Sequence, residues 1–405
     1  MNETSELIAT AQENLLPIYR QRALILDRGK GSRLWDLEGN EYIDFAAGIA
    51  VNALGHGDAE ILAALHDQAA KLWHTSNVFF TEPSIRLAEE LVTASGFARH
   101  VYLCNSGTEA NEAAIKLVRK HAAEQGRAED QRVILSFAGS FHGRTLAAVT
   151  ATAQPKYHQG YEPLPGGFRY SPFNDIAALD QVLIEDVAGV LVEPIQGEGG
   201  VVPTTDEFLR ALRERCDAIG ALLVFDEIQS GMGRSGKLWA HQWSGVQPDV
   251  MTLAKALGCG FPIGAMLVGS RAAQTMQFGS HGTTFGGNPL AAAVARVALR
   301  RLASPEIGTN VEQRSQQLRE GLESIASELG VFTQIRGRGL MLGAVLAPAW
   351  AQRGGEILDA AAAEGLLLLQ AGPEVLRFVP ALNIENADIT AGLQRLRLAL
   401  VSLSG

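Results

Sequence analysis

Short apolar runs alternate with amphipathic helical patterns through the middle of this 405-residue chain. The runs are rich in β-branched residues and have the length of strands, whereas the segments between them show the spacing of one-sided helices. In chain order, the strand and helix candidates are 101–104, 109–121, 133–137, 187–192, 206–219, 221–225 and 263–268. This alternation predicts an α/β fold whose mostly parallel sheet is covered by helices on both faces.

The two ends of the chain show different patterns. Residues 33–37 and 41–45 flank a Gly-Asn turn and predict a β-hairpin, and a helical pattern follows at 59–72. After Pro289 an Ala-rich helical pattern extends to Leu302. Beyond it, the helix and strand candidates are 314–329, 334–336, 340–345, 355–364 and 376–379. These shorter, mixed elements predict a smaller α+β domain.

A chain of 405 residues is too long for one ordinary hydrophobic core, so we expect more than one domain. We predict a large domain over residues 59–288 and a small C-terminal domain over residues 289–405. The N-terminal segment, residues 1–58, is predicted to pack on the small domain. Because ligands of parallel sheets bind at the carboxyl ends of the strands, we expect the functional site and any cofactor in the large domain.

The charge and the cysteines argue against several classes of protein. The formal net charge of −10 argues against nucleic-acid binding, because phosphates need many basic partners. No apolar stretch is long enough to span a membrane, and the first ten residues contain Glu3 and Glu6 without the apolar core of a signal peptide. Cys104, Cys216 and Cys259 show no metal-binding spacing. We therefore expect free thiols, no metal and a cytoplasmic protein.

One glycine motif suggests a nicotinamide cofactor, but only weakly. Gly231, Gly233 and Gly236 match the GxGxxG pattern of dinucleotide-binding folds. That fingerprint opens a helix directly after its strand, whereas here the segment 226–229 intervenes and no clean helical pattern begins after Gly236. A nicotinamide oxidoreductase is therefore a remote alternative.

A segment of small residues follows the strand candidate at 101–104. Ser106, Gly107 and Thr108 lie at the start of a helical pattern, where exposed N–H groups and the helix dipole favour an anion such as phosphate. Capping of the helix, completed by Glu109, explains the same residues. The two interpretations are compatible, since a capped helix end can also bind an anion.

Charged residues stand at the ends of two other apolar segments. Asp226 and Glu227 close the strand candidate at 221–225, and buried carboxylates are costly without a partner. An arginine, a metal or the protonated ring nitrogen of a pyridoxal cofactor can serve as that partner. Lys255 stands among apolar and small residues, 29 positions after Asp226. It is either a lysine whose head reaches solvent or an amine nucleophile activated by an apolar pocket.

Six motifs in collinear order resemble those of a known family. They are Asn105-Ser-Gly-Thr-Glu-Ala-Asn-Glu, Phe141-His-Gly-Arg-Thr, Glu193-Pro-Ile-Gln-Gly-Glu, Phe225-Asp-Glu-Ile-Gln, Ala254-Lys-Ala-Leu-Gly and His281-Gly-Thr-Thr-Phe-Gly-Gly-Asn-Pro. Together they resemble the class III, or ω-amino acid, aminotransferases of pyridoxal-phosphate fold type I. The likeness extends from about Ile18 to Leu396. It implies pyridoxal 5'-phosphate (PLP) as the cofactor and a homodimer with shared active sites.

The resemblance implies roles for the residues around the cofactor. Lys255 would bind PLP covalently and carry a proton, and Asp226 would pair with the ring nitrogen. Gln229 would lie near the ring hydroxyl, and Phe141 would stack on the ring. The phosphate would be held by Ser106, Gly107 and Thr108, and by Thr284 of the partner subunit.

The resemblance also implies which residues bind the substrates. The reacting amine of the donor is terminal, so the α-carboxylate lies several bonds away, and an arginine is its natural bidentate partner. Arg144 matches the family's donor clamp, with Thr283 nearby. Arg377 matches the arginine for the α-carboxylate of 2-oxoglutarate, and Glu198 matches the carboxylate that covers it. A purely structural ion pair between Arg377 and Glu198 is the alternative interpretation.

We therefore expect an aminotransferase of arginine metabolism that moves the terminal amine of N-acetylornithine to 2-oxoglutarate. Gly48 favours an acylated donor, because ornithine-specific relatives carry there a tyrosine that contacts a free α-amino group. A succinylated donor or another ω-amine is the nearest alternative. A mutase or racemase on the same fold fits two arginine clamps less well, and a non-catalytic PLP-binding protein does not explain the intact set of site residues.

Two further positions depart from the family pattern. Residues 55–58 lack the His-Pro pair that relatives carry, and physical chemistry offers no account of that change. Cys259 stands where a third glycine is usual. We expect the cysteine to be tolerated if φ there stays below zero, where a side chain causes no strain.

Overall fold

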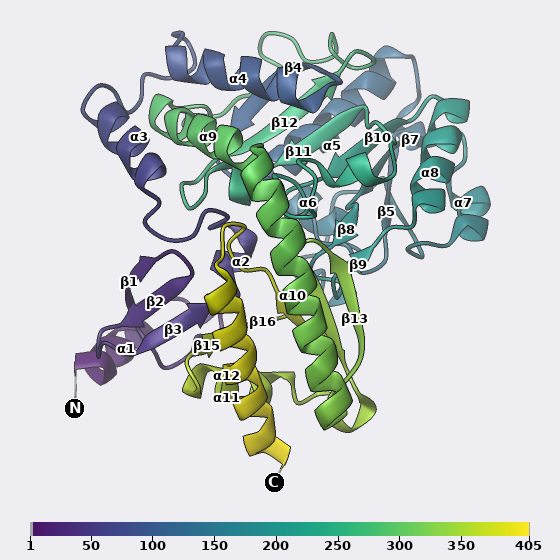
Figure 1. Ribbon diagram of the computed structural model, residues 1–405. Helices are drawn as coiled ribbons and strands as arrows, with labels where there is room; N and C mark the ends of the chain where they lie inside the picture. Colours follow the sequence, from purple (N-terminus) through teal and green to yellow (C-terminus); the bar gives the residue numbers. More distant parts are fainter. Residues whose placement is uncertain (1–2, 405) are drawn as a thin grey trace.

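The computed structural model describes residues 3–404, and a seven-stranded sheet forms its largest layer (Figure 1). The strand order is β4-β12-β11-β10-β7-β5-β6. Six of these strands run in one direction, and β12 is antiparallel to both of its neighbours. The bounds are β4 Ala98–Cys104, β5 Val133–Phe137, β6 Phe168–Ser171, β7 Val187–Val192, β10 Leu222–Asp226, β11 Val250–Leu253 and β12 Gly264–Gly269. The predicted α/β fold with a mostly parallel sheet is confirmed.

Helices cover both faces of this sheet, as the side chains of β10 show. Leu222 and Val224 point to one face and join the core cluster that contains the apolar side of α5. Leu223 and Phe225 point to the other face and pack with α8. Because alternate side chains of a strand point to opposite faces, a strand that is apolar throughout needs cover on both. The helices around this sheet are α5 Gly107–Glu124, α6 Leu146–Ala151, α7 Ile176–Val182 and α8 Asp206–Ile219.

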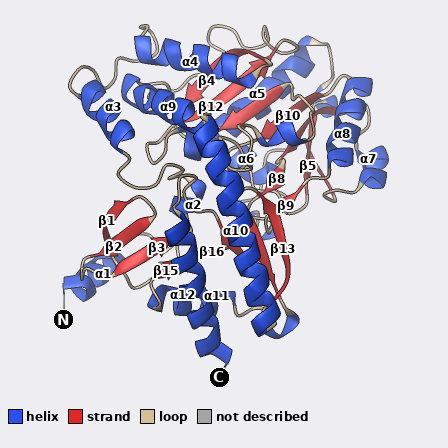
Figure 2. Cartoon of the chain, viewed as in Figure 1, coloured by secondary structure: helices blue, strands red, loops and turns tan. Residues whose placement is uncertain are grey.

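The C-terminal part of the chain builds a second, smaller sheet with the order β13-β14-β17-β16 (Figure 2). Helix α9 leads from the large sheet into the long helix α10, which packs beside this second sheet. The bounds are α9 Pro289–Leu302, α10 Pro305–Leu329, β13 Phe332–Arg338, β14 Met341–Leu346, α11 Gly354–Ala363, β15 Leu366–Leu367, β16 Leu369–Gln370, β17 Val375–Phe378 and α12 Asn386–Ser404.

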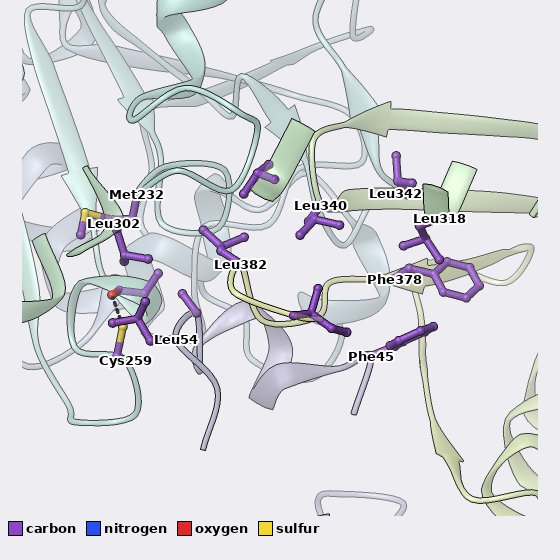
Figure 3. Packing of buried hydrophobic residues seen from close by; sticks show 14 of the residues in the cluster. Phe45, Leu54, Met232, Cys259, Leu302, Leu318, Leu340, Leu342, Phe378 and Leu382 are labelled. Carbon is purple, nitrogen blue, oxygen red and sulfur yellow. Dashed lines mark hydrogen bonds between the residues drawn. The ribbon is translucent and has the colours of Figure 1, made fainter. Parts of the chain in front are cut away.

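The N-terminal hairpin lies against this C-terminal part. Strand β3 pairs in parallel with β15, which joins the hairpin to the end of the chain. Phe45 meets Phe378 edge to face with ring centroids 6.4 Å apart, and both belong to the largest buried cluster (Figure 3). The domain boundaries at residues 58 and 288 stay a prediction. The bounds of the N-terminal elements are α1 Glu3–Asn14, β1 Leu26–Lys30, β2 Arg33–Asp36, β3 Glu41–Asp44 and α2 Ala47–Ala50.

Several elements differ from the sequence-based prediction. Helix α10 begins at Pro305, nine residues before the predicted start, because the Ser304 side chain caps it and a proline suits the first helical position. Helix α3 ends at Ala69 and not at Leu72. The hydrophobic periodicity of the sequence does not predict helix α4, and strands β8 and β9 are too short to show a periodic pattern. Their bounds are α3 Ala59–Ala69, α4 Glu82–Ser95, β8 Ile195–Gln196 and β9 Val202–Pro203. No helix between residues 3 and 404 is both long and apolar enough to cross a membrane.

Candidate active site

A cavity of about 440 Å³ opens where β10 and β11 end and helix α5 begins. This is the edge of the sheet at which ligands of parallel sheets bind. Most of the predicted site residues line it: Ser106, Gly107, Thr108, Phe141, Arg144, Asp226, Gln229 and Lys255. Segments more than 100 residues apart in sequence therefore converge on one pocket.

The N-terminus of α5 forms one wall of the cavity. The Ser106 hydroxyl accepts a hydrogen bond from the N–H of Glu109, and the Glu109 carboxylate accepts the N–H of Asn105 at 2.7 Å. This reciprocal cap leaves the N–H groups of Gly107 and Thr108 without a partner among residues 3–404. A Cβ on Gly107 would lie 2.8 Å from Ile228 Cδ1, so only glycine lets the chain approach so closely. Capping and an anion cradle are both present.

Asp226 ends β10 and turns its carboxylate towards the cavity. Its Oδ2 atom accepts hydrogen bonds from Asn111 Nδ2 and from His142 Nδ1, each at 2.8 Å. Its Oδ1 atom accepts the N–H of Ile228 at 3.1 Å. The neighbouring Glu227 has a different role, since it accepts both N–H groups that begin the turn at residues 240–243. The two adjacent carboxylates therefore have different roles: Asp226 lines the pocket, and Glu227 supports a loop.

Lys255 lies directly beyond β11, at the start of a short 3₁₀ turn. Its φ of +46° is in the left-handed region, which a non-glycine residue adopts only where the surrounding structure holds it there. Its amine has no hydrogen bond or ion pair within residues 3–404. Burial, assisted by the positive charge of Arg377 and opposed by Glu198 and Asp226, lowers the Lys255 pKa to about 8. The pocket therefore holds a lysine that loses its proton easily.

Strand β17 of the C-terminal sheet brings Arg377 to the same site. The guanidinium donates to Glu198 Oε1 at 2.5 Å and to Gln229 Oε1 at 3.2 Å. Arg377 is almost fully buried, whereas the Glu198 side chain keeps about a quarter of its surface exposed, at 24%. A buried cation is thus covered by a carboxylate that still reaches solvent.

Arg144 differs from Arg377 because it is exposed and makes no ion pair within the described residues. Its guanidinium carbon lies 4.0 Å from the centre of the Tyr157 ring and 5.6 Å from that of Phe141. These rings hold the guanidinium by cation–π contact without using its N–H donors. Arg144 is therefore free to bind an anion from solution.

The backbone beside Arg144 is held by a buried acid. The Phe141 N–H donates to Glu193 Oε2 at 2.9 Å, and burial raises the Glu193 pKa to about 7.

Comparison with known proteins decides the family. The family described as aminotransferase class-III matches residues 17–400. The chain belongs to the class-III aminotransferases.

Individual members of the class-III aminotransferases match the chain over nearly its whole length. The acetylornithine aminotransferase of Xanthomonas campestris pv. campestris is 67% identical over 96% of this chain and 95% of its own. A succinylornithine transaminase of Yersinia pseudotuberculosis is 50% identical over 96% and 95%. The crystal structure of N-acetylornithine aminotransferase from Stenotrophomonas maltophilia K279a superposes with a TM-score of 0.87, at 55% identity over 98% and 99%.

Class-III aminotransferases depend on PLP, and the cavity of this member fits that cofactor. An anion cradle at the start of α5 suits the phosphate, and the uncovered amine of Lys255 suits its aldehyde. The Asp226 carboxylate suits a protonated ring nitrogen. The residues present therefore match the chemical groups of PLP.

Four predicted site residues of this class-III aminotransferase do not line the cavity. Arg377 adjoins it through Gln229, with Glu198 bound to Arg377. Thr283 Oγ1 accepts a hydrogen bond from Asn105 Nδ2 at 3.3 Å, and Thr284 is exposed. Asn77 donates to the backbone of Thr283 and Gly286, which holds this loop in place.

Sequence reasoning missed several residues of the site. Asn111 and His142 bind Asp226, Glu193 binds the backbone of Phe141, and Tyr157 supports Arg144. A signal existed for Asn111, because it is a polar residue on a helix face that otherwise carries Ala110, Ala114 and Val118. His142 and Glu193 belong to two of the six family motifs, but the neighbouring residues in the sequence do not reveal which side chains they contact.

Two expectations about loops change with the structure of this class-III aminotransferase. Cys259 adopts φ +44°, so the condition under which we expected the cysteine to be tolerated is not met, and the tight turn after Lys255 imposes the left-handed conformation on it. The segment with Gly231, Gly233 and Gly236 forms turns and no helix. It lacks the helix N-terminus that a nicotinamide site requires, which removes that alternative.

Proposed function

We propose that this class-III aminotransferase moves the terminal amine of N-acetyl-L-ornithine to 2-oxoglutarate, giving N-acetyl-L-glutamate 5-semialdehyde and L-glutamate. The observation that carries the proposal is the contrast between its two arginines. Arg144 is exposed and unpaired among residues 3–404, whereas Arg377 is buried under Glu198. Arg144 can therefore bind a carboxylate at any time, whereas Arg377 can do so only when Glu198 moves away.

This contrast suits two substrates that carry carboxylates at different distances from the reacting carbon. The donor's α-carboxylate lies several bonds from its terminal amine and would bind Arg144. While the donor reacts, Glu198 neutralises Arg377, so no second carboxylate is drawn to that end of the pocket. For 2-oxoglutarate, Glu198 would swing towards solvent and Arg377 would bind the carboxylate beside the reacting carbon. The 24% exposure of Glu198 supports this movement, since the side chain is already at the surface.

The remaining residues serve the cofactor and the proton transfer. Bound PLP supplies an electron sink for the carbon that carries the amine. Lys255 Nζ would be the nucleophile that attaches the cofactor and the base that moves the proton, because its lowered pKa of about 8 gives a far larger neutral fraction near physiological pH than an ordinary lysine has. Asp226 would keep the ring nitrogen protonated, and Phe141 and Gln229 would hold the ring. Ser106, Gly107 and Thr108 would bind the phosphate.

We propose in addition that the enzyme is a homodimer with shared active sites. Large apolar side chains are exposed along two segments that lie side by side: Trp73, Val78, Phe79, Phe80 and Phe285. A contact between His74 and Phe285, with ring centroids 5.1 Å apart, joins the two segments. A contiguous apolar surface of this kind marks an interface. Thr284 projects from it, so in a dimer it would reach the phosphate in the partner's pocket, with Thr283 near the partner's Arg144.

Gly48 supports an acylated donor over free ornithine. It lies in the α2 segment, next to Val51 of the cavity wall, and carries no side chain. No tyrosine side chain is therefore available there to contact a free α-amino group. Steady-state kinetics with 2-oxoglutarate test the proposal. N-acetylornithine should exceed free ornithine in kcat/KM by at least about tenfold, a difference typical of one polar contact. Equal values would exclude the proposed donor.

Succinylornithine is the second candidate donor, and one observation favours it. Lys156 Nζ lies 4.7 Å from the centre of the Tyr157 ring, whose ring also supports Arg144. A second cation beside the donor clamp can bind the additional carboxylate of a succinyl group. Comparison of kcat/KM for the two acylated donors ranks them.

We propose a cytoplasmic location for the enzyme. Cys104, Cys216 and Cys259 are all buried as free thiols, which suits a reducing compartment. Cell fractionation followed by the transamination assay tests this.

A further inference from the structure

Asn111 is the polar residue on which the elements around Asp226 converge. It lies in the second turn of α5 and is fully buried, at 0% exposure. Its amide nitrogen donates to Asp226 Oδ2 at 2.8 Å and to the carbonyl of His142 at 2.7 Å. Its amide oxygen accepts the hydroxyl of Thr252 at 2.8 Å. One side chain thus ties α5 to β10, to β11 and to the loop that carries Phe141.

The chemistry of the neighbours fixes how this amide is oriented. The Asp226 carboxylate and the His142 carbonyl are both acceptors, so both must face the NH₂ group. The Thr252 hydroxyl is the group that can donate to the remaining amide oxygen. A flipped amide would place its oxygen against two acceptors at under 3 Å, which no neighbour could relieve. An amide is therefore required at this position, and a carboxylate cannot replace it.

We propose that Asn111 is a positioning residue that sets Asp226 for the cofactor, an inference that rests on the role proposed for Asp226. Asn111 and His142 together hold Oδ2, which leaves Oδ1, bonded only to the N–H of Ile228, with open acceptor capacity. Asn111 also donates to the backbone carbonyl of His142, the second donor to Oδ2, so it contacts both Asp226 and its other partner. Without Asn111, the Asp226 carboxylate would rotate, and the cofactor ring would lose its fixed partner.

The test uses full-length Asn111→Asp and Asn111→Ala, with Thr252→Val and Asp226→Ala as controls. Asn111→Asp keeps the shape but sets a second acid against Asp226, whereas Asn111→Ala removes the donor and leaves space. Thr252→Val removes a hydrogen bond to Asn111 that does not touch Asp226. Each protein is titrated with PLP for its dissociation constant, and the visible circular dichroism per bound PLP reports how firmly the ring is oriented. Melting of the PLP-free form reports stability.

We expect Asn111→Asp to weaken PLP binding by at least about tenfold, the scale of one charge-assisted hydrogen bond, and to reduce the visible dichroism. Asn111→Ala should act in the same direction by a smaller factor, and it keeps the test valid if Asn111→Asp does not fold. Thr252→Val should stay within about twofold of wild type. Lower melting temperatures with unchanged PLP affinity and dichroism in both Asn111 variants would overturn the inference and leave a purely structural residue.

Asp226→Ala separates this inference from the proposed function. If Asp226→Ala loses PLP affinity and the Asn111 variants do not, only the inference about Asn111 fails. If Asp226→Ala itself binds PLP as tightly as wild type with the same dichroism, the role proposed for Asp226 fails, and the inference about Asn111 fails with it.

Discussion

Arg377 and Glu198 form an ion pair with Nη1 and Oε1 2.5 Å apart, and this pair connects strand β17 of the C-terminal sheet to the turn between β8 and β9. Gln229 joins the same guanidinium at 3.2 Å, so the contact also reaches the cofactor cavity. A cation that is buried and covered by a partly exposed carboxylate can be uncovered by one side-chain rotation. The pair therefore suits an enzyme that must accept two substrates in turn.

Glu198→Gln should separate the two half-reactions. The variant keeps the shape of the side chain but leaves the charge of Arg377 uncompensated during the donor half-reaction. We expect kcat/KM for N-acetylornithine to fall by about 10- to 100-fold, the scale of a hydrogen bond to a charged group, while KM for 2-oxoglutarate stays the same or falls. Steady-state kinetics with each substrate varied in turn measure both values. Equal losses for the two substrates would leave a structural ion pair as the explanation.

Arg144→Lys should impair the donor alone. A lysine keeps the charge but cannot make two parallel hydrogen bonds to a carboxylate or stack flat on the Tyr157 ring. We expect KM for N-acetylornithine to rise by about tenfold, with 2-oxoglutarate unaffected. Tyr157→Leu is the matched control, since it removes the ring and keeps Arg144, and it should raise the same KM by a smaller factor of about two to five. An increase in KM for 2-oxoglutarate of the same size would contradict the assignment.

Lys156→Met tests which acyl group the donor carries. The exposed ammonium lies beside the clamp formed by Arg144 and Tyr157, so its removal should weaken only a donor with an additional carboxylate. We expect kcat/KM for succinylornithine to fall by about three- to fivefold, as befits an exposed charge, and that for N-acetylornithine to stay within about twofold. The ratio of the two kcat/KM values is the measured quantity. A ratio equal to that of the wild type would remove Lys156 from the donor site.

The pKa of Lys255 predicts how attachment of PLP depends on pH. Burial lowers this pKa to about 8, and only the neutral amine is a nucleophile, so the attachment rate should rise with pH and level off above about pH 8. The positive charge of Arg377 contributes to this lowering, so Arg377→Met should move the inflection to higher pH. Stopped-flow absorbance on the full-length protein, freed of PLP, gives the rate. An inflection that stays near the ordinary lysine value of about 10.4 in wild type would refute the buried, activated amine.

The motifs predicted much of this site because its chemistry is carried by local segments. The cradle at residues 106–108, Asp226 and Lys255 each follow or end an apolar strand, and parallel strands present their carboxyl ends on one edge. Periodicity likewise identified β5, β7, α8 and α9 with their observed ends. These features depend on neighbours within a few residues, which the sequence displays directly.

The remainder depends on contacts between distant segments. Asn111 and His142 meet at Asp226 across 115 and 84 residues of chain, and Arg377 meets Glu198 across 179. Contacts between residues so far apart in the chain produce no periodic pattern in the sequence. The φ of Cys259 is another example, because the tight turn between Lys255 and Phe261 sets it against the residue's own preference. The role proposed for Thr284 requires a second copy of the chain, which a single sequence cannot display.

The most direct test of the account follows glutamate formation from N-acetylornithine and 2-oxoglutarate by the wild-type enzyme and by Lys255→Ala. We propose that Lys255 carries both the attachment of PLP and the proton transfer, so the wild type should turn over many times and release one glutamate for each semialdehyde. Lys255→Ala should lose at least about a hundredfold in kcat, the lower end for a general base, while it still binds PLP. Wild-type protein that forms no glutamate, or Lys255→Ala that turns over at the wild-type rate, would contradict the account.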